Sequence, residues 1–176
     1  MKNKTDSTDF LLAYAKLKQP VYNYVLKMIR DKQQSEDIVQ NTFLKLFSNM
    51  HLIRQKESIP QWVFRSARND IYQYFRTKRT HVDSFNVANV DEIHEASPEN
   101  PESQYELLNI KEVVNQELDK LPVEQKDVFL LREYNCLSYR EIAELLDTEE
   151  ELVKSRLYKA RTKLIARLKT LIIFNG

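Results

Sequence analysis

Apolar residues recur every three to four positions along most of this chain, a spacing that predicts amphipathic helices rather than strands. The pattern is interrupted over residues 81–103, where helical periodicity is absent and Pro98 and Pro101 stand among acidic and Asn residues. We therefore expect an all-α fold of two small helical domains, 1–80 and 104–176, joined by a flexible acidic linker at 81–103. The expected helices are 8–31, 35–49 and 59–79 before the linker, and 103–119, 123–134, 138–146 and 149–173 after it.

Local signals predict several helix ends. Pro20 is expected to break or kink the first helix, because its ring clashes with the preceding turn. Ser35 is expected to cap the second helix. Pro122 marks a break between two later helices, and Ser138 with Glu141 three residues on predicts a capping box.

Composition narrows the classes of function. The single glycine disfavours hairpin-rich β architecture and any Gly-rich phosphate loop. One cysteine and three scattered histidines give no metal-ligand spacing, and the sequence shows no nucleophile–base constellation, so we expect no metal, no cofactor, no small-molecule substrate and no enzymatic activity. The N-terminus MKNKTDSTDF has no apolar core, and no apolar run approaches about 18 residues, so we expect a cytoplasmic protein without membrane insertion.

The net charge of +1 conceals strong patterning. Residues 1–82 carry 15 Lys and Arg against 7 Asp and Glu, whereas residues 83–106 carry 7 acids and no base. Residues 107–176 carry 12 of each, yet the segment 153–170 within them holds seven bases and no acid. Two basic surfaces separated by an acidic segment indicate nucleic-acid binding, although solvated helix faces and a polar linker would give the same pattern.

The helix expected at 59–79 interleaves aromatic and basic residues. At about 100° per residue, one side is apolar and carries Val63, Phe64, Ala67, Ile71, Tyr74 and Phe75. The opposite side carries Arg65, Arg68, Asn69, Tyr72, Arg76 and Arg79, with Trp62 at its edge. Guanidinium groups hold phosphates, and aromatic rings stack on unpaired bases. This face suits single-stranded or melted nucleic acid; the alternative is a basic amphipathic helix in which Trp62 closes the edge of the core.

The preceding helix shows an apolar residue on its polar side. Its buried stripe is expected to hold Val39, Phe43, Leu46 and Phe47, and its other side carries Asp37, Gln40, Asn41, Leu44 and Lys45. Leu44 among polar groups indicates a contact with another protein, although one exposed leucine is ordinary in soluble proteins.

Residues 137–164 have the pattern of a helix-turn-helix. The first helix would pack through Ile142, Ala143, Leu145 and Leu146, and the second through Val153, Leu157, Ala160, Leu164 and Leu168. The outer surface of the second helix carries Lys154, Ser155, Arg156, Lys159, Arg161, Thr162 and Lys163. Such a helix fits the major groove of duplex DNA; the alternative is a helical hairpin with a basic back.

Three segments resemble, in order, parts of the bacterial sigma factors of the extracytoplasmic-function (ECF) group, two-domain members of the sigma-70 family. SEDIVQNTFLKLF is similar to the polymerase-binding helix of region 2, and SIPQWVFRSARNDIYQYFR to its promoter-melting and −10-recognition helix. LPVEQKDVFLLREYNCLSYREIAELLDTEEELVKSRLYKARTKL resembles region 4, which reads the −35 element. The resemblance covers almost the whole chain. It implies a non-catalytic factor that binds core RNA polymerase and promoter DNA, and an anti-sigma factor is a common further partner in the family.

The resemblance also implies roles for three sets of residues. The polymerase-binding set is Asp37, Gln40, Asn41, Leu44 and Lys45. The −10 set is Trp62, Arg65, Arg68, Asn69 and Tyr72, with Arg76, Lys78 and Arg79 on backbone phosphate and the loop 53–60 capturing a flipped base. The −35 set is Lys154, Ser155, Arg156, Lys159, Arg161 and Lys163.

Two departures from the family pattern matter. Housekeeping relatives have two adjacent tryptophans where this chain has only Trp62, so we expect weaker melting and stricter promoter choice. The turn before the last helix lacks the usual glycine, so Asp147 is expected to adopt a left-handed conformation, and Thr148 with Glu151 to cap the helix. The glutamates at 149–151 would repel phosphates, which leaves open which part of this helix contacts bases.

A helix-turn-helix regulator without a sigma role is the main alternative function. It would explain the second domain but would leave Trp62, Tyr72 and the surface around Leu44 unexplained, and no clear dimer seam is visible. A helical interaction module with no DNA role would make the basic segment 153–170 a coincidence. Binding to core polymerase separates these alternatives from a sigma factor.

Overall fold

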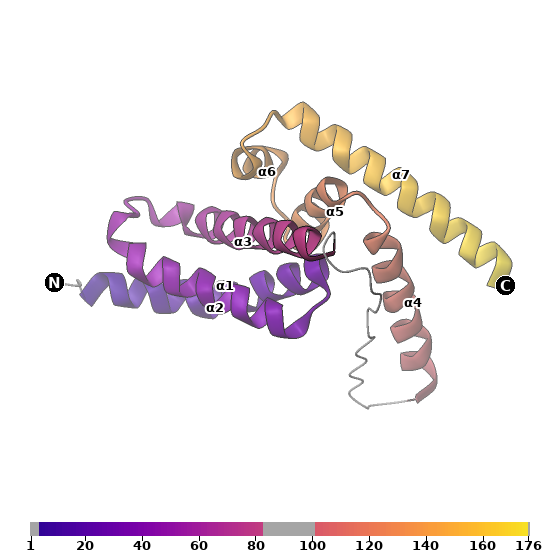
Figure 1. The fold of residues 1–176 in the computed structure, drawn as a ribbon, viewed down its shortest axis with the longest axis horizontal. Helices are drawn as coiled ribbons and strands as arrows, with labels where there is room; N and C mark the ends of the chain where they lie inside the picture. Colours follow the sequence, from indigo (N-terminus) through magenta and orange to yellow (C-terminus); the bar gives the residue numbers. More distant parts are fainter. Residues whose placement is uncertain (1–3, 83–100, 176) are drawn as a thin grey trace.

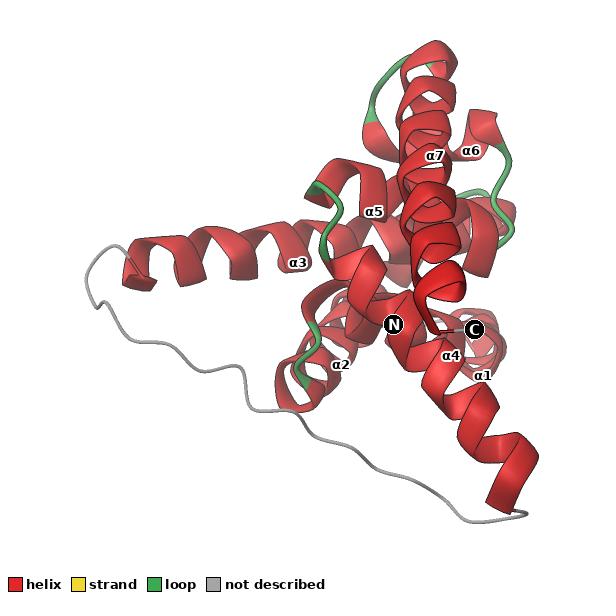
Figure 2. Cartoon of the chain, turned by 90° about the vertical axis from the view of Figure 1, so that its right-hand side faces the viewer, coloured by secondary structure: helices red, strands yellow, loops and turns green. Residues whose placement is uncertain are grey.

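The computed structural model of the chain describes residues 4–82 and 101–175, so most of the linker expected at 81–103 lies outside the described residues. These residues are almost entirely helical and contain no strand, and the predicted all-α fold of two helical regions is confirmed (Figures 1 and 2). The first half contains α1 (Lys4–Ile29), α2 (Lys32–Asn49), the short 3₁₀ turns η1 (Met50–Leu52) and η2 (Lys56–Ser58), and α3 (Ile59–Val82). The second half contains α4 (Pro101–Asp119), α5 (Val123–Phe129), a π-helical turn η3 (Leu130–Tyr134), α6 (Tyr139–Leu146) and α7 (Glu150–Asn175).

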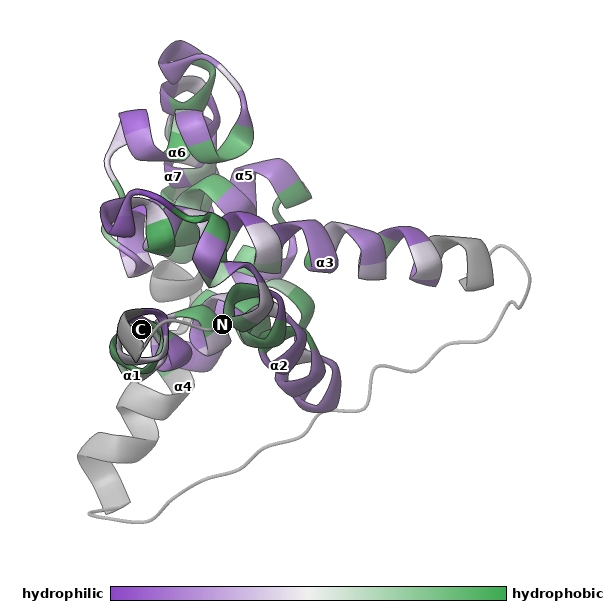
Figure 3. Ribbon diagram, turned by 90° about the vertical axis from the view of Figure 1, so that its left-hand side faces the viewer, coloured by the Kyte–Doolittle hydropathy of each residue, from purple (hydrophilic) through white to green (hydrophobic). Residues whose placement is uncertain are grey.

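Each half has apolar helix faces turned inward, as the hydropathy colouring of the ribbon shows (Figure 3). In the first half, Val21 and Val25 of α1, Leu46 of α2, and Val63 and Ile71 of α3 are completely buried. Tyr74 and Phe75 are only half-buried, and Phe47 is exposed, so the expectation that these three rings would be buried is wrong. Phe47 lies two residues before the end of α2, and Tyr74 and Phe75 lie beyond Ile71, the last fully buried residue described on α3.

In the second half, α6 and α7 form the predicted helix-turn-helix on top of α5 and η3 (Figure 1). Val128, Leu131, Ile142, Val153 and Leu157 bury their side chains at this junction. Leu146 and Leu168, expected in the same core, are half-buried at its margin.

Two predictions about helix ends are wrong: the break at Pro20 and the residue that caps α2. Pro20 lies inside α1, which runs unbroken from Lys4 to Ile29. The buried neighbours Val21, Tyr24 and Val25 hold this segment against the rest of the fold, and tertiary packing overrides the local cost of proline.

The cap of α2 is the other correction. Asp31, not Ser35, is the N-cap, and its carboxylate accepts a hydrogen bond from the backbone N–H of Gln34 at 3.0 Å. Ser35 lies one turn inside the helix and is completely buried, with its hydroxyl donating to the Asp31 carbonyl. Asp and Ser are both favourable N-cap residues, so residue type alone could not show at which of the two positions the helix begins.

The caps of the helix-turn-helix are mostly as predicted. The Ser138 backbone N–H donates to the Glu141 carboxylate at 2.7 Å, and the Glu141 N–H donates to the Ser138 hydroxyl. The backbone hydrogen bond from Ser138 lowers the pKa of Glu141. Asp147 has a left-handed conformation with φ 53°, as predicted for the residue that stands at this turn in place of a glycine. The helix then begins one residue later than expected, because Glu149, rather than Thr148, accepts the first backbone bonds of α7.

The two halves pack against each other, and polar contacts cross the junction. The Lys126 ammonium of α5 donates to the carbonyl of Met28, near the C-terminal end of α1, at 3.2 Å. Lys27 lies 4.5 Å from the centre of the Tyr134 ring, and Arg30 pairs with Glu112 at 2.9 Å. In this arrangement α6 lies against α3, while α7 runs along the outer edge of the molecule (Figure 1).

Candidate nucleic-acid and polymerase interfaces

The outer face of α2 carries the five residues of the polymerase-binding set. All of them are exposed: Asp37, Gln40, Asn41, Leu44 and Lys45. Leu44 has 57% of its surface exposed, although the opposite stripe of the helix is packed in the core through Val39, Phe43 and Leu46. Lys45 is held in place by Asp70 of α3, with both carboxylate oxygens at 2.7 Å from its ammonium. The helix therefore exposes an apolar side chain surrounded by polar ones, which is the arrangement of an apolar core and a polar rim found in protein–protein interfaces.

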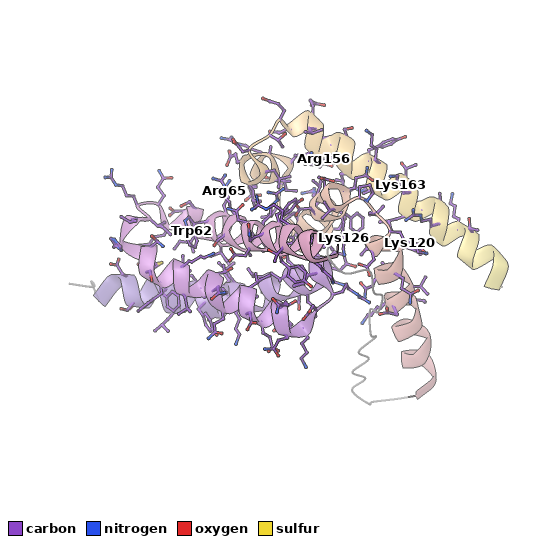
Figure 4. All side chains as sticks on the ribbon, viewed as in Figure 1. Trp62, Arg65, Lys120, Lys126, Arg156 and Lys163 are labelled. Atoms are coloured by element: carbon purple, nitrogen blue, oxygen red, sulfur yellow. The ribbon has the colours of Figure 1, made fainter. Side chains whose placement is uncertain are left out.

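Trp62, labelled in Figure 4, lines an open hollow of about 600 Å³ at the start of α3. The ring is half-buried, so it neither seals the core nor stands free in solvent. The other residues that line the hollow come from the end of α2 and the following loop: Asn49, Leu52, Ile53, Arg54, Gln55 and Ser58. An aromatic face beside amide, hydroxyl and guanidinium groups can stack on a base and hydrogen-bond its edge.

On the same helix, Gln61 and Arg65 contact α6 of the second half. Arg65 donates to the backbone carbonyl of Glu144, and the Gln61 amide donates to the Glu144 carboxylate at 3.1 Å. Arg65 points toward α6 in Figure 4. The hydrogen bond from Arg140, followed by that from Gln61, lowers the pKa of Glu144.

One turn further, Arg68 and Tyr72 meet a buried carboxylate. Asp127 of α5 is completely buried and accepts three hydrogen bonds from the first half of the chain. Arg68 Nε lies 2.7 Å from one oxygen and the Tyr72 hydroxyl 3.0 Å from the same oxygen, while the Tyr24 hydroxyl of α1 lies 2.6 Å from the other. The Arg68 guanidinium also lies over the Tyr72 ring, 4.1 Å from its centre.

Burial and charge act together on these groups. Burial and the neighbouring Asp127 carboxylate raise the pKa of both Tyr24 and Tyr72, so the two phenols stay protonated donors. Burial acts to lower the pKa of Arg68, but Asp127 outweighs it and the net direction is upward. The cluster is a satisfied carboxylate–guanidinium pair with two phenol donors, the arrangement that a buried charge requires.

The −10 set is therefore divided. Arg65, Arg68 and Tyr72 are bound to the second half, whereas Asn69 and Lys78 are exposed. Arg76 is also exposed and donates to Gln73 of its own helix. Arg79 lies within α3, but its side chain is outside the described residues.

The −35 set lies along α7, which runs at the edge of the molecule; Figure 4 labels two of its members, Arg156 and Lys163. Arg156 is half-buried, and the others are exposed: Lys154, Ser155, Lys159, Arg161 and Lys163. Lys154 pairs with Glu151 at 2.7 Å, and Arg161 Nε lies 3.1 Å from the Glu133 carboxylate. These acids hold Lys154 and Arg161 close to the protein surface, while Ser155, Lys159 and Lys163 are open to solvent.

Sequence reasoning missed Asp127, Glu144 and Tyr24. Asp127 stands directly before the apolar run Val128–Leu131, and a carboxylate next to such a run was a weak sign of a buried charge. Its partners are 55 to 103 residues away in the chain, so periodicity within one helix could not identify them.

None of the helices in residues 4–82 and 101–175 has the length and apolarity needed to cross a bilayer. The same residues contain no group of three His, Cys, Asp or Glu side chains placed to hold a metal ion.

Comparison with known proteins gives consistent matches. Residues 13–81 match the family model "Sigma-70 region 2", and residues 111–164 match "Sigma-70, region 4". The chain is 29% identical over 146 residues to the ECF RNA polymerase sigma factor SigM of Bacillus subtilis, covering 83% of this chain and 86% of SigM. It is 28% identical to the RNA polymerase sigma factor YlaC of the same organism, covering 93% of this chain and 92% of YlaC.

A solved structure has a similar fold. The sigma factor RpoE of Bartonella quintana, crystallised with the anti-sigma factor NepR, superposes with a TM-score of 0.75 at 21% identity. The match covers 92% of this chain and 97% of RpoE.

Proposed function

The chain belongs to the sigma-70 family, in its ECF group, and we propose that it binds core RNA polymerase and directs promoter-specific initiation of transcription. One observation carries this proposal. A single chain has two separate surfaces suited to bind DNA and a third surface suited to bind a protein. Trp62 with its hollow and the basic face of α3 form the first, and the outer side of α7 forms the second. The exposed Leu44 on α2 marks the third.

Each surface has a distinct role in the proposal. Asp37, Gln40, Asn41, Leu44 and Lys45 would bind the polymerase clamp. Trp62 would stack on an unpaired −10 base, and the hollow beside it would receive a flipped one. Arg76, Lys78 and Arg79 would hold backbone phosphate. On α7, Lys154, Ser155, Arg156, Lys159, Arg161 and Lys163 would contact −35 duplex.

Cooperation between the surfaces follows from their covalent connection. Two weak DNA contacts on one chain reinforce each other, so neither needs high affinity alone. We propose domains at 1–80 and 104–176, joined by a linker at 81–103. The chain would act without catalysis of its own, in the cytoplasm with the polymerase, and an anti-sigma factor is a further partner that the proposal allows.

The test uses purified chain, bacterial core polymerase and a library of promoter fragments. We expect a stable complex with core and transcripts that start at defined positions. Leu44→Asp should abolish both, because a carboxylate replaces the apolar contact. Leu12→Asp on α1 is the matched control, since Leu12 is exposed to a similar extent but lies outside the proposed set. Failure of the wild-type chain to bind core would contradict the proposal.

A regulator that acts without polymerase is not favoured. Such a protein needs only the helix-turn-helix, which lies within the region 4 match at residues 111–164, whereas this chain also matches region 2 over residues 13–81.

A further inference from the structure

We propose that Arg161 of α7 positions this helix for −35 reading instead of contacting DNA, and that Glu133 of η3 holds it in that role. The inference rests on the proposed function, because it concerns how α7 meets the −35 duplex. It refines the −35 set in two ways: Arg161 leaves the group that touches DNA, and Glu133, which belongs to none of the three sets, becomes a positioning residue.

Arg161 differs from Lys154 in the kind of contact that it makes. Both its Nε, at 3.1 Å, and one of its terminal nitrogens donate to the same Glu133 oxygen. Lys154 pairs with Glu151 of its own helix. Two donors of one planar guanidinium on a carboxylate fix the orientation of the arginine as well as its distance. The Arg161 contact therefore ties α7 to a different element of the fold.

The turn that carries Glu133 is itself firmly held. In η3 the Asn135 backbone N–H donates to the Leu130 carbonyl at 3.2 Å, and the Asn135 side-chain amide donates to the same carbonyl at 3.0 Å. The Arg132 guanidinium donates to the Leu137 carbonyl, just past the turn, at 2.8 Å. Short π-helical turns are frequent at functional sites. Here the turn gives the Glu133 carboxylate a fixed anchor.

A third element, α6, joins this group through its first residue, Tyr139. The Arg132 guanidinium lies over the Tyr139 ring, 4.9 Å from its centre. The hydrogen bond to Glu133 is the largest cause that raises the pKa of Arg161, and the Tyr139 side chain acts in the same direction. A network of several groups contributes more than an isolated exposed ion pair. Glu133, Arg132, Tyr139 and Arg161 thus connect η3, α6 and α7.

Apolar packing alone sets the angle of α7 only loosely. The helix packs against α5 and α6 through its buried stripe of Val153, Leu157, Ala160 and Leu164 (Figure 1). Such burial is non-directional, whereas hydrogen bonds require defined distances and angles. Arg161 follows Ala160 directly, so its contact acts beside the stripe and limits rotation of α7 about its axis. Since base edges are read by hydrogen bonds of fixed geometry, a rotated α7 would lose several base contacts together.

The first test uses the sign of one effect. Glu133→Gln keeps the shape of the side chain and removes its charge. We expect closed complexes of core polymerase, the full chain and a duplex promoter selected by the wild-type chain to weaken roughly 3- to 10-fold, as for loss of one partly exposed hydrogen bond. If Arg161 instead binds DNA, the variant frees it and removes a negative charge, and binding tightens. Tighter or unchanged binding in the gel shift would overturn the proposal.

The matched control is Glu124→Gln, which removes the same charge from an exposed position on α5. We expect less than about a twofold change in affinity. Urea unfolding of both variants should stay close to wild type, so that weaker binding is not a loss of fold. An equal weakening by Glu124→Gln would mean that overall charge, rather than the Glu133 contact, controls binding, and would refute the inference.

The second test measures salt dependence in Arg161→Gln. Removal of a residue that binds phosphate reduces the slope of log affinity against log salt by about 0.9. We expect lower affinity with the slope unchanged, and −35 selection that becomes flatter at every position read by α7. A slope reduced by about 0.9, or flattening confined to one position, would show that Arg161 contacts DNA.

Combining Glu133→Gln with Arg161→Gln tests whether the two residues act as a unit. Both changes remove the same contact, so the double variant should bind no more weakly than Arg161→Gln alone. Losses that add would contradict the shared role.

The contact can also be judged in the chain without polymerase. The Nε–H resonance of Arg161, identified by its absence in Arg161→Gln, should exchange slowly with water, and Glu133→Gln should speed this exchange. Equally fast exchange in both proteins would refute the contact itself. Failure of the wild-type chain to bind core would instead contradict the proposed function, and the exchange measurement keeps the two outcomes apart.

Discussion

The two basic helices, α3 and α7, differ in what covers them. The face of α3 is bound by acids of the second half, with Asp127 at the centre, whereas α7 keeps most of its basic face in solvent. On α7 the acids are local: Glu151 lies on the same helix as Lys154, and Glu133 lies across from Arg161. Basic side chains are therefore largely bound within the fold on α3 but largely exposed to solvent on α7.

This difference shows that burial determines whether an arginine stabilises the fold or remains available to a ligand. A buried guanidinium is a structural element as long as its carboxylate stays in place, and removal of one partner leaves an uncompensated charge. An exposed guanidinium contributes little to stability and is available to a ligand. Each of the following variants tests one side of this comparison.

The largest expected effect is on stability, in Arg68→Ala against Arg156→Ala. Loss of Arg68 leaves the buried Asp127 without its cation and should lower the free energy of unfolding by about 3 kcal/mol. The partial exposure of Arg68 places the effect at the lower end of the range for buried pairs. Arg156 is partly buried but has no buried carboxylate partner among the described residues, so its loss should lower the free energy of unfolding by about 1 kcal/mol or less. Urea unfolding followed by circular dichroism measures both, and equal losses would remove the distinction between the helices.

Trp62→Ala should act on melting rather than on duplex binding. If one base stacks on this ring, its loss reduces open complexes roughly 5- to 150-fold, the equivalent of about 1–3 kcal/mol. Permanganate reactivity of the −10 region measures open complexes, and a gel shift measures closed ones. Trp62→Phe should restore part of the activity, because an aromatic face remains. An equal decrease in both kinds of complex would contradict the stacking role.

Arg156→Ala should relax sequence choice at the −35 element. A base contact from arginine contributes about 1–3 kcal/mol of discrimination, so selection over a −35 library should become flatter at one or two positions. Lys169→Ala is the control, since Lys169 is exposed on the same helix but outside the proposed set. Unchanged selectivity in the Arg156 variant would exclude it from base reading.

The smallest expected effect is in Glu151→Gln, which frees Lys154 and removes one negative charge near the DNA. Closed-complex affinity should increase by up to about fivefold at low salt, as expected for one exposed charge pair. The gain should shrink at high salt, because exposed charges are screened. Glu124→Gln, an exposed acid on α5, is the control. Weaker binding in the Glu151 variant would show that Glu151 assists α7 more than it repels phosphate.

The sequence predicted those features that depend on neighbouring residues. The Ser138 capping box, the left-handed Asp147 and the exposed side of α2 all follow from spacing within one or two turns. Pro20 shows where such reasoning fails, since α1 continues through it under the packing of Val21 and Tyr24. Local signals alone could not weigh that packing.

The junction between the halves could not be predicted for a related reason. Helical periodicity identified the face of α3 that carries Arg65, Arg68 and Tyr72, but not the groups that cover it. Its partner Asp127 lies on a short helix beyond the linker, 59 residues from Arg68. The pairing depends on how two domains dock, which spacing along one helix does not encode.

Transcription by the wild-type chain and core polymerase, over a library with both the −10 and −35 regions randomised, tests the central claim most directly. If α3 and α7 read one promoter together, the initiating sequences will show two separate blocks of preference at a fixed spacing. A single block, or transcripts without a defined start, would contradict this account.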